Sequence, residues 1–340
     1  MKAIRFHQHG GLDVLRYEEV PDPEIGPGEV LVRVGACALN HLDLWQRRGL
    51  PGLRLPHSPG SDVAGEVVRA DGADVPRGLR VMLQPGLSCG QCAQCLSGTD
   101  NLCSGYDVLG YRSEGGYAEL VKVPARNLIP IPDSVGFREA AAFPLTFLTA
   151  WHMLITRAGL RAGETVLVLA AGSGVGQAAV QIARLHGAQV FATAGSDEKL
   201  ARARTLGAHE VINHYTQDIA EEVRKLTSRR GVDVVVEHVG KATWDKSVKS
   251  LARGGRLVTC GATSGWAASI DLRHLFARQL SLLGSYMGTK GELLQAAQLF
   301  FAGQLTPVVD RAFPLEAAAE AQRRLEESQQ FGKVVLEPQR

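Results

Sequence analysis

The sequence predicts an α/β protein with a β-rich first part and a second part built on a doubly wound parallel sheet. Short apolar runs separated by Gly and Pro fill the first third of the chain, which is typical of β structure. After about residue 160, apolar runs that suit buried parallel strands alternate with helical patterns. A glycine-rich turn at 171–176 joins the first of these runs to a helical stretch.

In the first part, strands are expected at 30–34, after a turn at 26–28, and at 64–69, after Pro59-Gly60. The second part is expected to contain strands at 165–170, 189–193, 211–212, 232–236, 256–259 and 280–283, and helices at 175–186 and 197–206. Gly207 is placed to end the second helix. The last fifty residues hold two helical patterns and a strand at 333–336, and we expect them to return to the first domain.

Composition sets the broad class of the protein. The 340 residues suggest about two domains, and 45% hydrophobic with 21% charged residues is ordinary for a soluble globular protein. Lys and Arg total 37 against 35 for Asp and Glu. The resulting net charge of +2 gives no electrostatic argument for a nucleic-acid or membrane partner.

Targeting signals and cysteine usage favour the cytoplasm. The first residues, MKAIRFHQHG, lack the apolar segment of a secretory signal. The longest uncharged stretch lies between Glu139 and Arg157; it is shorter than the ~20 residues of a membrane helix and contains Pro144, so we expect a buried helix there. The six cysteines are too unevenly spaced for a secreted disulfide scaffold.

The glycine-rich turn predicts a dinucleotide site. Its central residues are Gly172, Ser173, Gly174, Val175 and Gly176. Glycines let the backbone approach a pyrophosphate, and the following helix N-terminus supplies amide groups and a positive dipole. Gln177 stands where the strict G-x-G-x-x-G pattern needs its last glycine, and the alternative is an ordinary tight turn. The order of strand, turn, helix and second strand favours the dinucleotide.

The end of the second strand bears on cofactor choice. An NAD-selective site usually places an acidic residue there for the ribose 2′-hydroxyl, and 190–196 contains none, with Asp197 coming late. Ser196 and Lys199 are placed to contact a 2′-phosphate, so NADP(H) is favoured over NAD(H). The alternative is that Ser196 caps the next helix and Lys199 is solvated.

Four cysteines predict a structural zinc site. Cys89, Cys92, Cys95 and Cys103 have the form C-x2-C-x2-C-x7-C, and four thiolates on one loop suit a closed tetrahedral Zn²⁺ site. An iron–sulfur cluster is the alternative, but it needs a shorter last gap and a following Pro, where Ser104 stands. Disulfides are not expected in the cytoplasm.

Together these residues resemble the medium-chain dehydrogenase/reductase superfamily, which includes zinc-type alcohol dehydrogenases and quinone oxidoreductases. The resemblance rests on the motifs at 28–32, 59–62, 115–119 and 254–256, on the glycine turn and on the four cysteines, and it covers essentially the whole chain. It implies a GroES-like catalytic domain at 1–130 and 289–340, with a zinc lobe at 86–106, and a Rossmann NAD(P)-binding domain at 131–288. It also implies hydride transfer involving a nicotinamide, and a homodimer or homotetramer.

The departures from the family pattern concern the catalytic metal. Where zinc-type alcohol dehydrogenases have a Cys, a His-Glu pair and a further Cys or Asp, this chain has Asn40, Ser61-Asp62 and Leu145. These are poor zinc ligands or none at all. The resemblance therefore implies a member that retains the structural zinc and lacks the catalytic one, and 39–43 resembles the quinone oxidoreductase branch. A different metal site built from Cys37, His41, His57 and Asp62 is the alternative.

We therefore expect NAD(P)H-dependent reduction of quinones or α,β-unsaturated carbonyls, since this needs no Lewis acid for a hydroxyl proton. Asn40 is expected to contact the substrate carbonyl, with Ser61 and Thr146 nearby by family resemblance, and Asp43, Asp62 and His57 are candidates for proton relay. On the cofactor side, the resemblance places Thr149 beside the nicotinamide, and Val239-Gly240 and Cys260-Gly261 are expected to line the cofactor. The segment 285–289 is expected to approach the substrate. For each residue the alternative is a helix cap or a buried hydrogen bond.

Two other functions stay open at this point. One is an alcohol dehydrogenase or carbonyl reductase acting on small alcohols, aldehydes or ketones. The other is an NADPH-binding protein without physiological catalysis. In each enzymatic case the partner is a small carbonyl, quinone or alcohol.

Overall fold

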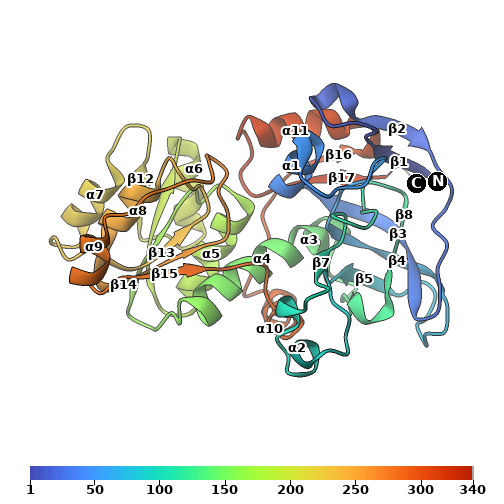
Figure 1. Cartoon of the computed structure of the whole chain (residues 1–340), viewed down its shortest axis with the longest axis horizontal. Helices are drawn as coiled ribbons and strands as arrows, with labels where there is room; N and C mark the ends of the chain where they lie inside the picture. The colour runs from blue at the N-terminus through green and yellow to red at the C-terminus, as the bar shows by residue number, and fades with distance from the viewer. Residues whose placement is uncertain (339–340) are drawn as a thin grey trace. The chain divides into compact units, whose positions relative to one another are not determined.

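The computed structural model of the chain describes residues 1–338 (Figure 1). The chain divides into two compact units, Met1–Leu145 with Thr289–Arg340 and Thr146–Gly288. The sequence-based boundary placed 131–145 with the second part, whereas the structure groups these residues with the first. The expected α/β class, with one β-rich and one doubly wound part, is confirmed.

The second unit is built on a parallel sheet in the order β12-β11-β10-β13-β14-β15 (Figure 1). Its strands are β10 (Thr165–Val168), β11 (Gln189–Ala194), β12 (Glu210–Asn213), β13 (Val232–Glu237), β14 (Leu251–Thr259) and β15 (Ser281–Gly284). The order reverses between β10 and β13. In doubly wound sheets, ligands bind beyond the carboxyl ends of the strands at this point.

The second unit also contains helices, and those between β10 and β14 in the chain contact strands of the sheet. The helices are α4 (Pro144–Trp151), α5 (Gly174–Leu185), α6 (Asp197–Thr205), α7 (Ile219–Leu226), α8 (Trp244–Ser250) and α9 (Leu272–Ala277). Leu167, Phe191 and Val235 from three neighbouring strands lie at the centre of the core with Val223 of α7. The predicted helix 197–206 is present as α6, and Gly207 follows it with a φ of +112° that favours glycine.

The first unit centres on a sheet in the order β16-β17-β3-β4-β5-β9, with β8 also paired to β3. Its strands are β1 (Lys2–Arg5), β2 (Arg16–Glu19), β3 (Glu29–Ala38), β4 (Asp62–Ala70), β5 (Arg80–Leu83), β6 (Gly86–Leu87), β7 (Asp107–Val108), β8 (Leu120–Pro124), β9 (Leu128–Pro130), β16 (Val309–Pro314) and β17 (Lys333–Glu337). β3 runs beyond the predicted 30–34 through Gly35, where a Cβ would lie 2.5 Å from the Phe137 ring. Close packing therefore requires glycine inside this strand.

The first unit contains further helices, and one prediction, for the stretch at 139–157, was wrong. They are α1 (His41–Gly49), α2 (Ala93–Leu96), α3 (Phe137–Ala142), α10 (Lys290–Phe301) and α11 (Ala318–Glu326). The uncharged stretch 139–157 was expected to be one buried helix. It is divided into α3, α4 and a π-helical segment (His152–Arg157), because Pro144 cannot continue α3 and instead begins α4. Over residues 1–338, no helix has the length and apolarity needed to cross a membrane.

Candidate active site and zinc site

A buried polar cluster forms where three chain segments meet in the first unit. Asn40 precedes α1, Asp62 begins β4 and Lys333 begins β17. β3 brings them together, because Ala38 pairs with Asp62 on one side and with Val335 on the other. Asp62 is 0% exposed, Lys333 3% and Asn40 8%. The sheet therefore buries a carboxylate and an ammonium that are 271 residues apart in the sequence.

Lys333 holds this cluster together. Its Nζ donates to Asn40 Oδ1 at 2.6 Å and to Asp62 Oδ2 at 2.8 Å. Asn40 Nδ2 donates to Asp62 Oδ2 at 3.0 Å, and the Leu145 amide donates to Asp62 Oδ1 at 2.8 Å. An ammonium only donates, so the amide oxygen of Asn40 must face Lys333. The side-chain amide hydrogens of Asn40, expected to contact a substrate carbonyl, are instead directed to Asp62 and, at 3.5 Å, to the Ala38 carbonyl.

Asp43 lies beside this cluster and is fully buried. Its Oδ2 accepts hydrogen bonds from the Asn40 amide at 2.8 Å and from the Tyr117 hydroxyl at 3.0 Å. Within residues 1–338, its Oδ1 has no hydrogen-bond partner. Burial raises the pKa of Asp43 from its usual 3.8 to about 6, although the Asn40 and Tyr117 hydrogen bonds oppose the rise.

This pKa predicts a pH-dependent cost of burying Asp43. The folded protein binds the proton more tightly than the unfolded chain, so the free energy of unfolding falls as pH rises from 3.8 to about 6. Relative to wild type, Asp43→Asn is expected to gain up to about 3 kcal/mol of stability over that pH range. Urea unfolding of both proteins at several pH values measures the difference. Asp133→Asn, at a fully exposed carboxylate, is the control, and a pH-independent difference for Asp43→Asn would contradict the assignment.

The structure places the other expected catalytic residues as follows. Ser61 Oγ is buried and has no hydrogen-bond partner within the described part of the chain. His57 Nε2 donates to the Gly110 carbonyl at 3.0 Å, and burial lowers the pKa of His57. Thr146 and Thr149 lie buried on α4.

The alternative metal site is wrong. Cys37, His41, His57 and Asp62 do not form a metal-ligating group. Over residues 1–338, the four lobe cysteines are the one such group of three or more side chains. Asp62 instead directs its oxygens to Lys333, Asn40 and the Leu145 amide.

In the second unit, the glycine turn follows β10 and leads into α5. Ser173 caps α5, because its Oγ accepts the Gly176 amide at 2.9 Å. A Cβ at Gly176 would overlap the backbone carbonyl of Ala170, so only glycine fits there. His238, which the sequence did not single out, follows β13, and its Nε2 lies 2.9 Å from the Leu169 carbonyl and 3.4 Å from Ser173 Oγ. The turn thus presents the N-terminus of α5 at the carboxyl end of the sheet.

The end of β11 leads into α6, whose first turn carries Asp197 and Glu198 as well as Lys199. Ser196 caps α6 by accepting the Lys199 amide at 3.4 Å, as the alternative interpretation expected. His214, which sequence reasoning missed, follows β12 and lies 3.4 Å from Thr193 Oγ1. Burial lowers the pKa of His214, and the charges of Lys199 and Lys246 lower it further.

The loop after β13 is held by the side chain of Glu237, the last residue of that strand. Its Oε1 accepts the Val239 amide at 2.6 Å and the Gly240 amide at 2.9 Å. Its Oε2 accepts the hydroxyls of Thr243 and Ser247. Burial raises the pKa of the Cys260 thiol, which precedes Gly261, to about 12. The Glu237 carboxylate therefore fixes the backbone of the loop after β13, and the raised pKa keeps Cys260 a neutral thiol.

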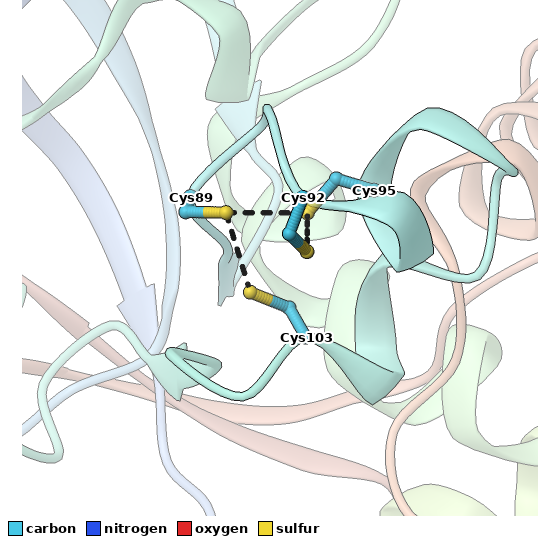
Figure 2. Close-up of side chains that lie close together, drawn as sticks. All are labelled: Cys89, Cys92, Cys95 and Cys103. Carbon is cyan, nitrogen blue, oxygen red and sulfur yellow. Dashed lines mark hydrogen bonds between the residues drawn. The ribbon is translucent and has the colours of Figure 1, made fainter.

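The four cysteines converge in the first unit, around α2 (Figure 2). Sulfur-to-sulfur distances are 3.8 Å for Cys89–Cys95, 3.5 Å for Cys92–Cys95 and 3.6 Å for Cys89–Cys103. A tetrahedron with Zn–S bonds of about 2.3 Å has edges of about 3.8 Å. The donor set and its spacing therefore fit one closed zinc site.

Comparisons with known proteins match both units. The model of the alcohol dehydrogenase GroES-like domain matches residues 26–133, and that of zinc-binding dehydrogenases matches residues 174–302. The quinone oxidoreductase of Pseudomonas aeruginosa is 34% identical over 351 residues, with 99% of each chain covered.

Solved structures show the same similarity. An NAD-dependent alcohol dehydrogenase has 49% identity and a TM-score of 0.96, with 100% of both chains covered. A 2-octenoyl-CoA carboxylase reductase, solved with NADP and 2-octenoyl-CoA, has 30% identity and a TM-score of 0.90, with 99% of this chain and 87% of that chain covered.

Proposed function

Because this chain belongs to the medium-chain dehydrogenase/reductase superfamily and is an NAD(P)-dependent oxidoreductase, we propose that it reduces quinones or α,β-unsaturated carbonyls with NADPH and without a catalytic zinc. The glycine turn and α5 would hold the cofactor pyrophosphate. The four-cysteine site would hold one zinc ion, which stabilises its lobe and takes no part in the reaction.

The observation that carries this proposal is the Lys333–Asp62 ion pair. It lies among residues that, by family resemblance, stand where zinc-type alcohol dehydrogenases bind their metal. The oxygens of Asn40 and Asp62 face the ammonium of Lys333 at 2.6 and 2.8 Å. A divalent cation at the same oxygens would meet a like charge in a low-dielectric interior. Leu145 offers no side-chain ligand at all.

The chemistry of an activated double bond suits such a site. Bound NADPH supplies a hydride to the β-carbon of the enone, and the electron pair of the double bond moves toward the carbonyl oxygen. The protein then has to orient the substrate, exclude water and stabilise the negative oxygen, which hydrogen-bond donors can do without a metal. The names of the Pseudomonas quinone oxidoreductase and of the 2-octenoyl-CoA carboxylase reductase support this substrate class.

Alcohol oxidation is the second candidate, since the 49% identical structure is an NAD-dependent alcohol dehydrogenase. Three substrates with the same six-membered carbon ring distinguish the two functions. With NADPH, cyclohex-2-enone is expected to be reduced at its double bond, while cyclohexanone is not reduced and cyclohexanol is not oxidised with NADP⁺. Steady-state kinetics with product analysis gives the answer. A larger kcat/KM for cyclohexanone or cyclohexanol than for the enone would favour the dehydrogenase.

We propose NADP(H) over NAD(H) on the charges near β11. A 2′-phosphate placed at the strand end would meet the α6 N-terminus at Ser196 and the ammonium of Lys199, with His214 nearby. Lys199→Glu is expected to weaken NADPH binding about tenfold or more, the loss of one charge-assisted hydrogen bond, and to leave NADH binding unchanged. Fluorescence titration measures both affinities. Lys225→Glu, on α7, is the control, and equal losses for both cofactors would contradict the assignment.

We also propose a homodimer or homotetramer of this chain. β15 is an edge strand of its sheet, and an edge strand suits pairing with a second copy. Large apolar side chains nearby in the sequence, Trp266, Leu272, Phe276 and Tyr286, are exposed in the isolated chain. Light scattering that detects a monomer alone would contradict this proposal. We further propose that the protein acts in the cytoplasm on small molecules.

A further inference from the structure

The buried cluster around Lys333 has one donor hydrogen left over. An ammonium carries three N–H groups, and within residues 1–338 Nζ has two acceptors, Asn40 Oδ1 and Asp62 Oδ2. The neighbouring donors are already directed elsewhere: the Asn40 amide to Asp62, and the Tyr117 hydroxyl to Asp43. The third N–H of Lys333 is therefore an uncommitted donor of the cluster; the hydroxyl of Ser61, next to Asp62 in the chain, is also without a partner among the described residues, but it carries no charge.

Leaving that hydrogen unpaired is unfavourable. Lys333 is 3% exposed, and a buried donor without an acceptor costs about 1–3 kcal/mol, more for a charged group. Asp62 balances the charge of the ammonium but not its third hydrogen. A site that retains such a donor is suited to a ligand oxygen that arrives with, or develops, negative charge.

We propose that Lys333 is a catalytic residue whose third N–H binds the oxyanion of the substrate. This rests on the proposed function and replaces the expected role of Asn40. Asn40 and Asp62 are then positioning residues, because each accepts one of the other two N–H groups and so orients Nζ. The sequence gives no sign of this role, since Lys333 is simply the first residue of a short strand pattern at the end of the chain.

The reaction step balances without any other co-reactant. The hydride leaves C4 of the nicotinamide with its electron pair and forms a bond to the β-carbon of the enone, so NADPH becomes NADP⁺. The double-bond pair shifts between the α-carbon and the carbonyl carbon, and the carbonyl π pair moves to oxygen. Lys333 donates its hydrogen bond to that enolate oxygen and keeps its proton. A water molecule then transfers a proton to the α-carbon and leaves as hydroxide, the enolate double bond returns to the carbonyl, and the saturated ketone forms.

Lys333→Met tests the role, since methionine keeps the length of the chain without the donor. The expected result is a kcat for cyclohex-2-enone about 100- to 1,000-fold lower, which is the typical effect of removing one oxyanion donor. KM and NADPH affinity should stay nearly unchanged. The loss should be smaller for a quinone, whose product oxygen is less basic and gains less from the hydrogen bond. Lys333→Arg should restore part of kcat. A purely structural lysine would lower both activities equally.

A stable oxyanion provides a readout that does not depend on turnover. In the presence of NADP⁺, 4-nitrophenolate is expected to bind wild type about tenfold or more tightly than Lys333→Met, since the variant lacks a charge-assisted hydrogen bond. Absorbance titration follows this binding. If wild type binds the phenolate through Lys333 but reduces neither enone nor quinone, the proposed function fails while the oxyanion site stands.

Two further variants keep the test decisive. Arg324→Met removes a different, partly buried ion pair of the first unit, the one between Arg324 and Asp310. This variant should leave kcat for the enone and 4-nitrophenolate binding unchanged. Lys333→Met/Asp62→Asn leaves no uncompensated buried charge and replaces the single variant if that one does not fold. The proposal is overturned if Lys333→Met, or the double variant in its place, keeps kcat within about threefold of the Arg324→Met value, far short of the expected donor loss.

Discussion

Asp62→Asn is expected to lower the free energy of unfolding by about 3–5 kcal/mol, because it breaks a buried ion pair and leaves the ammonium of Lys333 buried without a counter-charge. Asp62 is fully buried, and its Oδ2 accepts the Lys333 ammonium at 2.8 Å. Asparagine keeps the shape of the side chain and can still accept the Leu145 amide, but it cannot neutralise the ammonium. Urea unfolding at pH 7 measures the loss.

Two control variants distinguish the loss of the Lys333–Asp62 ion pair from other effects of the Asp62 substitution on stability. Lys333→Met/Asp62→Asn removes both charges and is expected to recover most of the lost stability. Glu222→Gln breaks the exposed pair with Lys225 and should change stability by less than about 1 kcal/mol. If the single and double variants were equally destabilised, the ion pair would not be the cause.

Cys103→Ser is expected to remove zinc from the protein and to loosen the lobe at 89–103. Cys103 is the most buried of the four ligands, and its Sγ lies 3.6 Å from that of Cys89 (Figure 2). Structural zinc sites supply about 10–16 kcal/mol of binding free energy to small domains, so the lobe depends on the metal. Elemental analysis and hydrogen exchange of the lobe peptides measure the two effects, and NADPH binding by the second unit should persist.

Cys260→Ser is the matched control for this experiment. Cys260 is a partly buried cysteine of the second unit, outside the lobe, so its replacement should leave the zinc content and the lobe's hydrogen exchange unchanged. Retention of full zinc content by Cys103→Ser would place the metal elsewhere and contradict the assignment.

Local sequence patterns predicted most of the fold. The strands of the second unit, the turn before α5 and the end of α6 each depend on residues close together in the chain, such as the apolar run in β10 or Gly207 after α6. The four cysteines belong to the same class, because ligand spacing within one loop is local information. The uncharged stretch at 139–157 is divided because Pro144 cannot continue a helix from its second turn onward, whatever the apolar composition around it.

The candidate active site was harder to predict because its bonds join distant segments. Asn40, Asp43 and Asp62 were found through family positions, but their partners were not. Lys333 is 271 residues from Asp62 and 293 from Asn40, and the pairing of β17 with β3 that joins them leaves no local pattern. His214 was missed for the same reason, since its neighbours Lys199 and Lys246 belong to other elements.

The number of zinc ions per chain tests the central claim most directly. Elemental analysis is made on protein purified without a metal-affinity tag and without added metal. One zinc per chain is the predicted result, since the four cysteines fit a closed site and Lys333 is bonded to Asn40 and Asp62. Two zinc ions per chain would contradict the account, because the second would have to displace this ion pair and restore the metal chemistry of an alcohol dehydrogenase.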